Sequence, residues 1–309
     1  MPDTTSAAVQ SPSKFVVFLR RFSSSILLWA VVLWALLSSN ELVSDYGTLV
    51  IMMAIAGIGL SEFYEIVSKR GLVCFRKLGI AAGLLMMATT FLYVSGKIGT
   101  RVDAAEVNDF ETTILIVFVL GLCVRQFMSK SNTAGIVAIS CTLFGLMYVP
   151  WLLNFIQKIK YFPAVNGAFY VLYFILVTKF SDLGAYTVGS LIGRHQMIPR
   201  VSPGKTWEGF GGAIAVSTLA SALFVHFAQD KLPEMNLTHA IVLGVVLGSS
   251  AVIGDLIESL FKREAGLKDS GRLFPGIGGM LDLMDSLLFN APLMYLYLRH
   301  ILAAHSSPP

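Results

Sequence analysis

The stretch His239-Ala-Ile-Val-Leu-Gly-Val-Val-Leu-Gly-Ser-Ser-Ala-Val-Ile-Gly-Asp-Leu-Ile-Glu-Ser-Leu-Phe261 decides the fold class of this chain. It is long enough to cross the roughly 30 Å of hydrocarbon in a bilayer, which takes about 20 helical residues. Its only acidic side chains, Asp255 and Glu258, lie near its C-terminal end. A helix is favoured because an isolated strand would leave backbone groups unpaired in lipid. The stretch therefore predicts a membrane-spanning helix.

The composition of the whole chain points the same way. Of its 309 residues, 55% are hydrophobic and 14% are charged, and the mean hydropathy is +0.71. A soluble domain has roughly 25% charged residues, so the composition excludes a soluble fold of this length. The net charge of +4 is modest and no nucleic-acid-binding motif occurs, so we expect no nucleic-acid partner. The spacing of Cys74, Cys123 and Cys141 indicates buried apolar side chains, not a disulfide framework or a zinc site.

Apolar runs of similar length recur along the sequence. They lie at 23–39, 47–67, 78–96, 112–128, 134–156, 165–185, 210–228, 239–261 and 284–304. These runs predict an all-α, polytopic integral membrane protein with about nine transmembrane helices. The first run follows three cations, as a signal peptide would, but no small-x-small cleavage site follows it.

The distribution of lysine and arginine predicts the orientation of these helices. Most of them lie in the N-terminal stretch and in the loops on the same side, which predicts a cytoplasmic N-terminus. The 194–209 loop and the segment after residue 261 are then cytoplasmic as well.

The chain shows no internal repeat and no hydrophilic domain boundary. The polar and acidic groups that lie inside apolar runs cluster in the last three or four runs. We therefore divide the chain into a disordered cytoplasmic N-terminus (1–22), N-terminal scaffold helices (23–156), a C-terminal catalytic membrane region (157–304) and a tail (305–309).

The most charged segment is Ser259-Leu-Phe-Lys-Arg-Glu-Ala-Gly-Leu-Lys-Asp-Ser-Gly-Arg-Leu-Phe-Pro-Gly-Ile-Gly-Gly-Met-Leu-Asp-Leu-Met-Asp285. Asp282 and Asp285 are three residues apart, so a helix that starts near residue 280 would present both on one face. Neighbouring carboxylates repel unless a cation lies between them, and oxygen ligands of this kind suit Mg²⁺. The glycines after Pro275 would let backbone N–H groups approach a phosphate. Asp255, inside the preceding run, adds a third carboxylate.

Each of these features also has a plainer interpretation. Asp282 and Asp285 could cap their helix, and Asp255 could form a structural ion pair. The cations could fix the topology or contact anionic lipid; they are Lys262, Arg263, Lys268 and Arg272. We favour a binding site because both signs of charge at close range are what a metal and a polyphosphate require.

A second polar segment lies upstream. Lys179 and Asp182 are three residues apart and could neutralise each other. Ser202-Pro-Gly-Lys-Thr206 offers a turn, two hydroxyls and a lysine, but it lacks the spacing of a P-loop. Four further residues have ordinary interpretations as interface, helix-start, loop or terminal residues: Trp207, Glu208, His195 and His300.

In these two segments the chain resembles the phosphatidate cytidylyltransferase family, the CDP-diacylglycerol synthases. The family pattern Ser-x-x-Lys-Arg-x4-Lys-Asp, Pro-Gly-His-Gly-Gly and Asp-Arg-x-Asp is matched by Ser259, Lys262, Arg263, Lys268, Asp269, Pro275, Gly276, Gly278, Gly279, Asp282 and Asp285. The pattern Asp-x-Gly-Ala-Tyr, followed by Ser-Pro-Gly-Lys-Thr-Trp-Glu-Gly, is matched by Asp182, Gly184, Ala185, Tyr186 and 202–209. Ile277 replaces the family's histidine and Leu283 its arginine, and neither side chain can bind phosphate or transfer a proton.

The resemblance implies an activity. The family transfers the cytidylyl group of CTP to phosphatidate, giving CDP-diacylglycerol and pyrophosphate in phospholipid biosynthesis. The nucleophile is the phosphate oxygen of the lipid, so catalysis reduces to positioning and neutralising two polyanions. We expect CTP, phosphatidate and the bilayer as partners, an active site at the cytoplasmic face of the plasma (inner) membrane and, from the resemblance, a homodimer.

The resemblance also assigns roles to residues. It implies Mg²⁺, with room for a second cation, held by Asp255, Asp282 and Asp285. The expected catalytic residues are Asp255, Asp282, Asp285, Lys262 and Lys268. The expected substrate-binding residues are Ser202, Lys205, Thr206, Arg263, Asp182, Gly278 and Gly279.

Three alternatives remain open at the level of sequence. The first is a cytidylyltransferase that acts on another lipid phosphate. The second is an ion-coupled transporter with Lys179, Asp182 and Asp255 on its path, although a transporter predicts acidic groups near the midplane and inverted repeats. The third is a non-catalytic relative, which Ile277 and Leu283 would explain.

Overall fold

The computed structural model describes residues 30–97, 104–129, 134–163, 165–271 and 278–302. The long helices are α2 (Thr48–Lys69), α3 (Arg76–Val94), α4 (Ala104–Phe127), α5 (Gly135–Leu146), α6 (Leu152–Lys160), α7 (Gly167–Ile192), α8 (Trp207–Phe227), α9 (Leu237–Glu264) and α10 (Met280–Tyr297). Short helical turns are η1 (Val43–Gly47), η2 (Met147–Trp151), η3 (Gln229–Lys231) and η4 (Leu298–Leu302), and the strands are β1 (Gln196–Ile198) and β2 (Ser202–Thr206). The helix α5 continues into α6 through the π-helical turn η2, where Pro150 has no N–H to donate.

Seven helices of the described ranges are long and apolar enough to cross a membrane. They are Val43–Lys69, Arg76–Val94, Glu106–Phe127, Gly135–Lys160, Gly167–Ile192, Trp207–Phe227 and Leu237–Glu264. The prediction of an all-α polytopic membrane protein is therefore confirmed.

Two predicted runs are not among these seven helices. The run 284–304 corresponds to α10 and η4, and of the run 23–39 the structure describes residues 30–39, which are helical at 30–37. The count of nine helices and the cytoplasmic N-terminus stay predictions. The expected disordered N-terminus (1–22) and the tail (305–309) lie outside the described residues.

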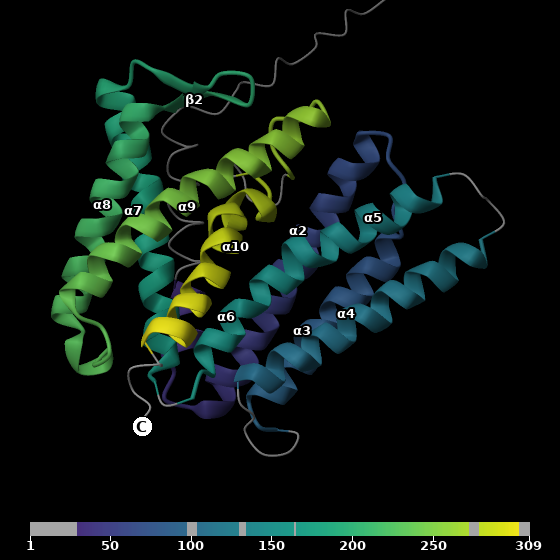
Figure 1. The fold of residues 1–309 in the computed structure, drawn as a ribbon, viewed down its shortest axis with the longest axis horizontal. Coiled ribbons are helices and arrows are strands. Elements are labelled where there is room, and N and C mark those ends of the chain that lie inside the picture. The colour runs from purple at the N-terminus through teal and green to yellow at the C-terminus, as the bar shows by residue number, and fades with distance from the viewer. Residues whose placement is uncertain (1–29, 98–103, 130–133, 164, 272–277, 303–309) are drawn as a thin grey trace, which may run out of the picture.

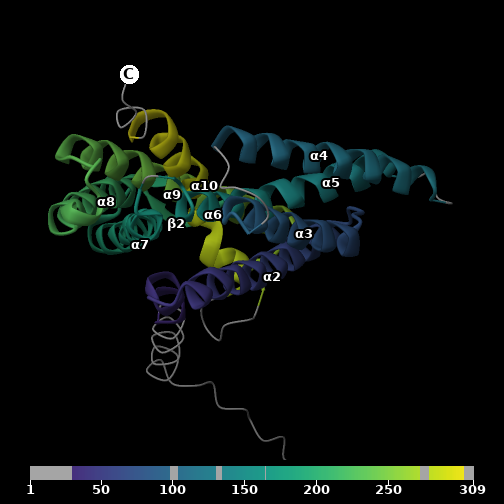
Figure 2. The ribbon, with the colours of Figure 1, turned by 90° about the horizontal axis from the view of Figure 1, so that it is seen from below.

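The helices form two groups with α10 and α6 between them. Figure 1 shows α7, α8 and α9 side by side in one group and α2, α3, α4 and α5 in the other. Figure 2, turned by 90°, keeps the same two groups apart with α10 and α6 in the middle. The hairpin of β1 and β2 lies at the end of the bundle where α7 ends and α8 begins. We call this end of the molecule the hairpin end.

Small side chains allow α7, α8 and α9 to pack closely. A Cβ on Gly184 would lie 2.5 Å from the carbonyl oxygen of Gly212, so these two backbones are in contact. The hydroxyl of Ser217 donates to the carbonyl of Gly244 at 2.8 Å and joins α8 to α9. Such contacts are typical of membrane helices, because lipid supplies no hydrophobic force between them.

Helix α10 is fixed between these helices by a buried amide. The Asn290 Nδ2 donates to the Thr178 hydroxyl of α7 at 2.7 Å and to the Leu247 carbonyl of α9 at 3.0 Å. Three helices are thus held in one register, and the first turn of α10 is placed at the hairpin end.

The N-terminal helices also bury polar groups. Lys158 of α6 forms an ion pair with Glu111 of α4, and their side chains are 3% and 2% exposed. The amide of Asn154 donates to the Glu111 carboxylate at 3.2 Å and to the Thr90 hydroxyl at 3.1 Å. The sequence-based interpretation that polar groups inside apolar runs cluster in the last three or four runs missed this network.

Candidate functional site

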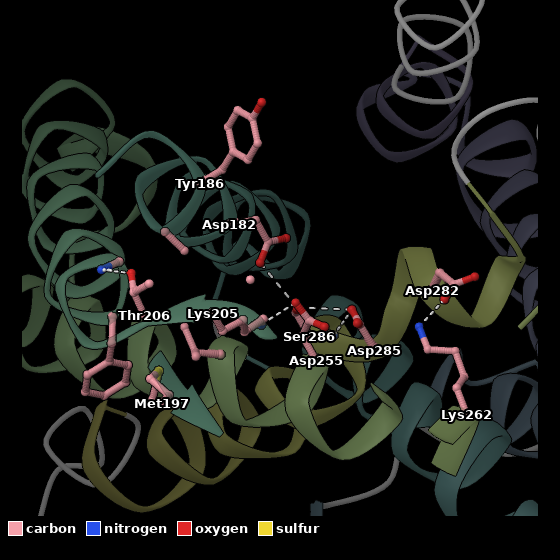
Figure 3. Close-up of a pocket in the computed structure, with 15 residues that line it drawn as sticks. Asp182, Tyr186, Met197, Lys205, Thr206, Asp255, Lys262, Asp282, Asp285 and Ser286 are labelled. Carbon is pink, nitrogen blue, oxygen red and sulfur yellow. Dashed lines mark hydrogen bonds and ion pairs between the residues drawn. The ribbon is translucent and has the colours of Figure 1, made fainter. Parts of the chain in front are cut away.

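A cavity of about 350 Å³ lies at the hairpin end, between β2, α7, α8, α9 and α10. Figure 3 shows that its polar side chains come from β2, α7, α9 and α10, while α8 contributes Gly209 and Phe210 to the lining. The polar side chains are Asp182, Tyr186, Lys205, Thr206, Asp255, Lys262, Asp282, Asp285 and Ser286. The structure therefore brings together most of the site residues predicted from the two sequence segments, which lie far apart in the chain.

The hairpin places Lys205 and Thr206 in this cavity. The strands pair antiparallel, with Gln196 opposite Thr206. The Thr206 hydroxyl accepts the N–H of Gly209 at 3.1 Å and so caps α8. The cap leaves the hydroxyl proton of Thr206 able to donate into the cavity.

Glu208 anchors the other side of the hairpin. Its carboxylate accepts the backbone N–H groups of Arg194 and His195 at 3.1 and 3.2 Å and contacts the His195 Nδ1 at 2.6 Å. The N–H of Trp207 donates to the His195 carbonyl at 2.9 Å. Glu208 is therefore more than a helix-start acid, because it fixes the connection between α7 and β1.

Asp255 and Lys205 form an ion pair across the cavity (Figure 3). The side chain of Asp255 is 35% exposed and that of Lys205 is 20% exposed. The Ser259 hydroxyl, one turn further along α9, donates to the Asp255 Oδ1 at 3.3 Å. The pair links the hairpin to α9.

Asp285 is the most deeply buried carboxylate that lines the cavity. It is 6% exposed, and its Oδ1 accepts the N–H of Ser286 at 2.5 Å and the Ser286 hydroxyl at 3.1 Å. The same hydroxyl lies 3.3 Å from the Asp182 Oδ1, so two carboxylates share one donor. Within the described ranges no lysine or arginine nitrogen lies within 4 Å of Asp285, whereas Lys179 pairs with Asp182 at 3.2 Å. A buried carboxylate without a cation favours binding of one.

Asp282 has a different environment. Its Oδ1 lies 2.5 Å from the Lys262 Nζ, and Lys262 also pairs with Glu258. Its Oδ2 accepts the N–H of Gly279 at 2.7 Å and both the N–H and the hydroxyl of Ser270, at 3.1 and 2.9 Å. Burial alone would raise the pKa of Asp282, but the hydrogen bonds from Lys262 and Gly279 outweigh it and hold this pKa below its ordinary value.

These environments separate the three predicted metal ligands. All three line the cavity, but the two oxygens of Asp282 face four donor groups, whereas those of Asp255 have Lys205 and Ser259 as partners and Asp285 has Ser286. Among the described residues, no three carboxylate, histidine or cysteine side chains form a ready-made metal site. The predicted set of Asp255, Asp282 and Asp285 stays a prediction.

Other predicted site residues lie outside the cavity lining. Lys268 is exposed. Arg263 donates to the backbone carbonyls of Val201 and Leu267, both at 3.1 Å, and so ties the hairpin to the end of α9. Ser202 begins β2 opposite Ile198. Arg272 and the stretch 275–277, with Ile277, lie outside the described residues.

Gly278 and Gly279 give room to protein carboxylates. A Cβ on Gly278, whose φ is +115°, would lie 2.6 Å from the Asp282 Oδ2. A Cβ on Gly279 would lie 2.5 Å from the Glu62 Oε2 and 2.2 Å from the Ser270 Oγ. Binding of a phosphate by these glycines stays a prediction.

Glu62 supports the site from outside the cavity lining, and the sequence interpretation missed it. It lies on α2, is 8% exposed, and accepts the N–H groups of Met280 and Leu281 at 3.0 and 2.8 Å. Its partners are more than 200 positions away in the chain, so no local pattern reveals them. A signal existed, because Glu62 is a carboxylate inside the apolar run 47–67, as Asp255 is in its own run.

Comparisons with known proteins give the family. The phosphatidate cytidylyltransferase of Haemophilus influenzae is 42% identical over 128 residues, 41% of this chain and 44% of the relative. That of Mycobacterium leprae is 40% identical over 152 residues, 49% of this chain and 47% of the relative. The uncharacterized protein YnbB of Escherichia coli is 37% identical over 162 residues, 52% of this chain and 51% of the relative.

The matched part of the chain thus spans about half the length of these curated relatives. The model of the cytidylyltransferase family matches a longer part, residues 19–301. The chain therefore belongs to the cytidylyltransferase family.

Proposed function

We propose that this protein transfers the cytidylyl group of CTP to phosphatidate and releases CDP-diacylglycerol and pyrophosphate. One observation carries the proposal beyond family membership. A cavity with two lysines and several carboxylates lies at the hairpin end of a bundle whose long helices are apolar enough to cross a membrane. A charged nucleotide and a lipid phosphate would both reach a site in that position.

The described side chains fit the steps of this reaction. A phosphate oxygen of the lipid attacks the α-phosphorus of CTP, the bond to the β-phosphate breaks, and pyrophosphate leaves. No enzyme nucleophile is required, so the protein has to align and neutralise the two anions. Lys205 and Lys262 line the cavity and supply cations for the phosphates, and the hydroxyl of Thr206 supplies a donor.

We propose that Asp255 and Asp285 hold the metal. Mg²⁺ usually takes one or two protein carboxylates and fills its shell with phosphate oxygens and water, so a third protein ligand is not required. Asp285 is buried and has no lysine or arginine nitrogen within 4 Å in the described part of the chain, and Asp182 shares a donor with it, so these oxygens are suitable ligands for a cation. The bound ion would supply positive charge to the triphosphate. Asp282 would contribute through Lys262.

We further propose that the hairpin end faces the cytoplasm and that the protein lies in the inner membrane. The distribution of lysine and arginine supports the orientation, and the bacterial relatives support the membrane. A homodimer, expected from the resemblance, and a second cation remain part of the proposal.

A transfer assay tests this function. Purified protein receives Mg²⁺, phosphatidate and CTP labelled at the α-phosphate, and we expect the label in a lipid product that requires all three. Asp285→Asn should abolish this labelling, and Lys231→Gln serves as a control because Lys231 lies in η3, in the connection between α8 and α9. If another lipid phosphate gave more labelled product than phosphatidate does, that lipid would be the substrate in place of phosphatidate. A folded protein that labels no lipid at all would refute the proposal.

A further inference from the structure

The first turn of α10 is held by a carboxylate from the other helix group. Each oxygen of Glu62 accepts one backbone N–H, Oε1 from Met280 at 3.0 Å and Oε2 from Leu281 at 2.8 Å. These N–H groups have no partner within their own helix, and the N-terminus of a helix carries a partial positive charge. No lysine or arginine nitrogen within the described ranges lies within 4 Å of the Glu62 carboxylate. The helix terminus is therefore what stabilises this buried charge.

Two glycines leave space for Glu62. A Cβ on Gly271 would lie 2.2 Å from the Glu62 Oε1, and a Cβ on Gly279 would lie 2.5 Å from Oε2. Real Cβ atoms do not approach an oxygen so closely. The carboxylate thus enters between two backbone positions that both need a hydrogen atom in place of a side chain.

Glu62 is connected to the cavity through Ser270. The Ser270 hydroxyl lies 3.1 Å from the Glu62 Oε2 and 2.9 Å from the Asp282 Oδ2. A hydroxyl has one proton, so it can donate fully to only one of these carboxylates. The other oxygen of Asp282 lies 2.5 Å from the Nζ of Lys262, which lines the cavity. Contacts thus run from Glu62 through Ser270 and Asp282 to Lys262.

We propose that Glu62 is a positioning residue for the cytidylyltransferase reaction: it fixes the first turn of α10 and the Ser270 hydroxyl, so that Asp282 holds the Lys262 ammonium in place for the triphosphate. This inference rests on the proposed function. Glu62 is absent from the cavity lining, so it acts through Asp282 and Lys262 and does not touch the substrate.

The test compares Glu62→Gln with a matched control on the same helix. A glutamine side chain offers one carbonyl oxygen, and its NH₂ would face a backbone N–H, so one of the two bonds to α10 is lost. Glu65→Gln removes a carboxylate whose side chain is 46% exposed and which pairs with Lys69 at 2.7 Å. We expect Glu62→Gln to raise the KM for CTP by roughly 10- to 100-fold, by analogy with residues that orient the ligands of a metal. Glu65→Gln should leave it unchanged, and Glu62→Asp should recover part of the loss.

A double-mutant cycle with Lys262→Gln separates positioning from folding. If Glu62 acts through Lys262, the fold increase in KM of the double variant should be far smaller than the product of the fold increases of the two single variants. Effects on KM that multiply would overturn the proposal, as would a Glu62→Gln variant that only unfolds at a lower temperature with an unchanged KM. If Glu62→Gln does not fold, Ser270→Ala removes the same connection, and an unchanged KM there would overturn the proposal equally.

The wild-type protein distinguishes the two levels of failure. An active wild type with an unaffected Glu62→Gln variant refutes the positioning role alone. A wild type without any labelled lipid refutes the proposed function, and the positioning role with it.

Discussion

Replacing Asp285 by asparagine should stabilise the protein while it abolishes activity. The Ser286 hydroxyl is 3.1 Å from the Asp285 Oδ1 and 3.3 Å from the Asp182 Oδ1, so these two oxygens are no more than about 6.4 Å apart. Two like charges at that separation repel by about 2.5 kcal/mol at an effective dielectric constant of about 20. Lys179 offsets part of this by pairing with Asp182. We therefore expect a net gain of about 1–2 kcal/mol in the free energy of unfolding.

The asparagine can keep the hydrogen bonds of the native carboxylate. Its carbonyl oxygen can accept both the N–H and the hydroxyl of Ser286, which are the donors that Asp285 now uses. The unfolding temperature of the purified protein, measured with a chelator present, should rise by about 2–6 °C. The transfer assay should show a loss of at least roughly 100-fold, because the proposed metal loses a charged ligand.

Asp282→Asn is the matched control and should have the opposite effect on stability. Asp282 has an ammonium at 2.5 Å and three further donors, so its replacement leaves Lys262 with less compensation. Loss of one partner of a buried ion pair costs about 3–5 kcal/mol, and the second carboxylate near Lys262 reduces that figure. The unfolding temperature should therefore fall. If Asp285→Asn also lowered the unfolding temperature, the argument that repulsion between Asp285 and Asp182 destabilises the native protein would be refuted.

Three further changes follow from the same geometry. Gly279→Ala should lower the free energy of unfolding by about 1–3 kcal/mol, because its Cβ would overlap two side-chain oxygens. Gly204→Ala, which has open space around it, should lower this free energy by less than about 0.5 kcal/mol. Thermal unfolding of the two variants measures the difference. Asp282, whose pKa lies below its ordinary value of 3.8, adds stability at neutral pH that is lost as the pH falls through that lowered pKa, so Asp282→Asn should flatten the acid side of the stability–pH curve. Thr206→Ala removes the cap of α8 and should cost about 1 kcal/mol in thermal unfolding and also raise the KM for CTP.

The helices were predictable from the sequence because one physical property determines them. Seven of the predicted apolar runs correspond to the seven described helices that are long and apolar enough to cross a membrane, since length and hydropathy act locally. The helix start near residue 280 was also predicted, and α10 begins at Met280. The pairing of β1 with β2 was less accessible, because Ser202-Pro-Gly-Lys-Thr206 indicates only a turn when it is read alone.

The site was predictable only as a set of residues. The spacing of Asp282 and Asp285 places both on one helical face, and both do line the cavity. The spacing cannot tell that Asp282 belongs to the first turn, where it meets Ser270 and Lys262. Asp285 is one turn deeper and has no lysine or arginine nitrogen within 4 Å among the described residues. That difference depends on which loop folds over the helix end, and this is a property of tertiary structure.

The same argument explains the glycine-rich stretch. Glycines before a helix indicate a phosphate site when the N–H groups of the first turn are free. Here the N–H groups of Gly279, Met280 and Leu281 all donate to carboxylates, Gly279 to Asp282 and the other two to Glu62. The glycine-rich stretch therefore does bind negatively charged groups, as the pattern indicates. In its described part, however, these groups are carboxylates of the protein itself. Because one of these carboxylates, that of Glu62, comes from α2, the N-terminal helices contribute to the geometry of a site whose cavity is lined by the C-terminal ones.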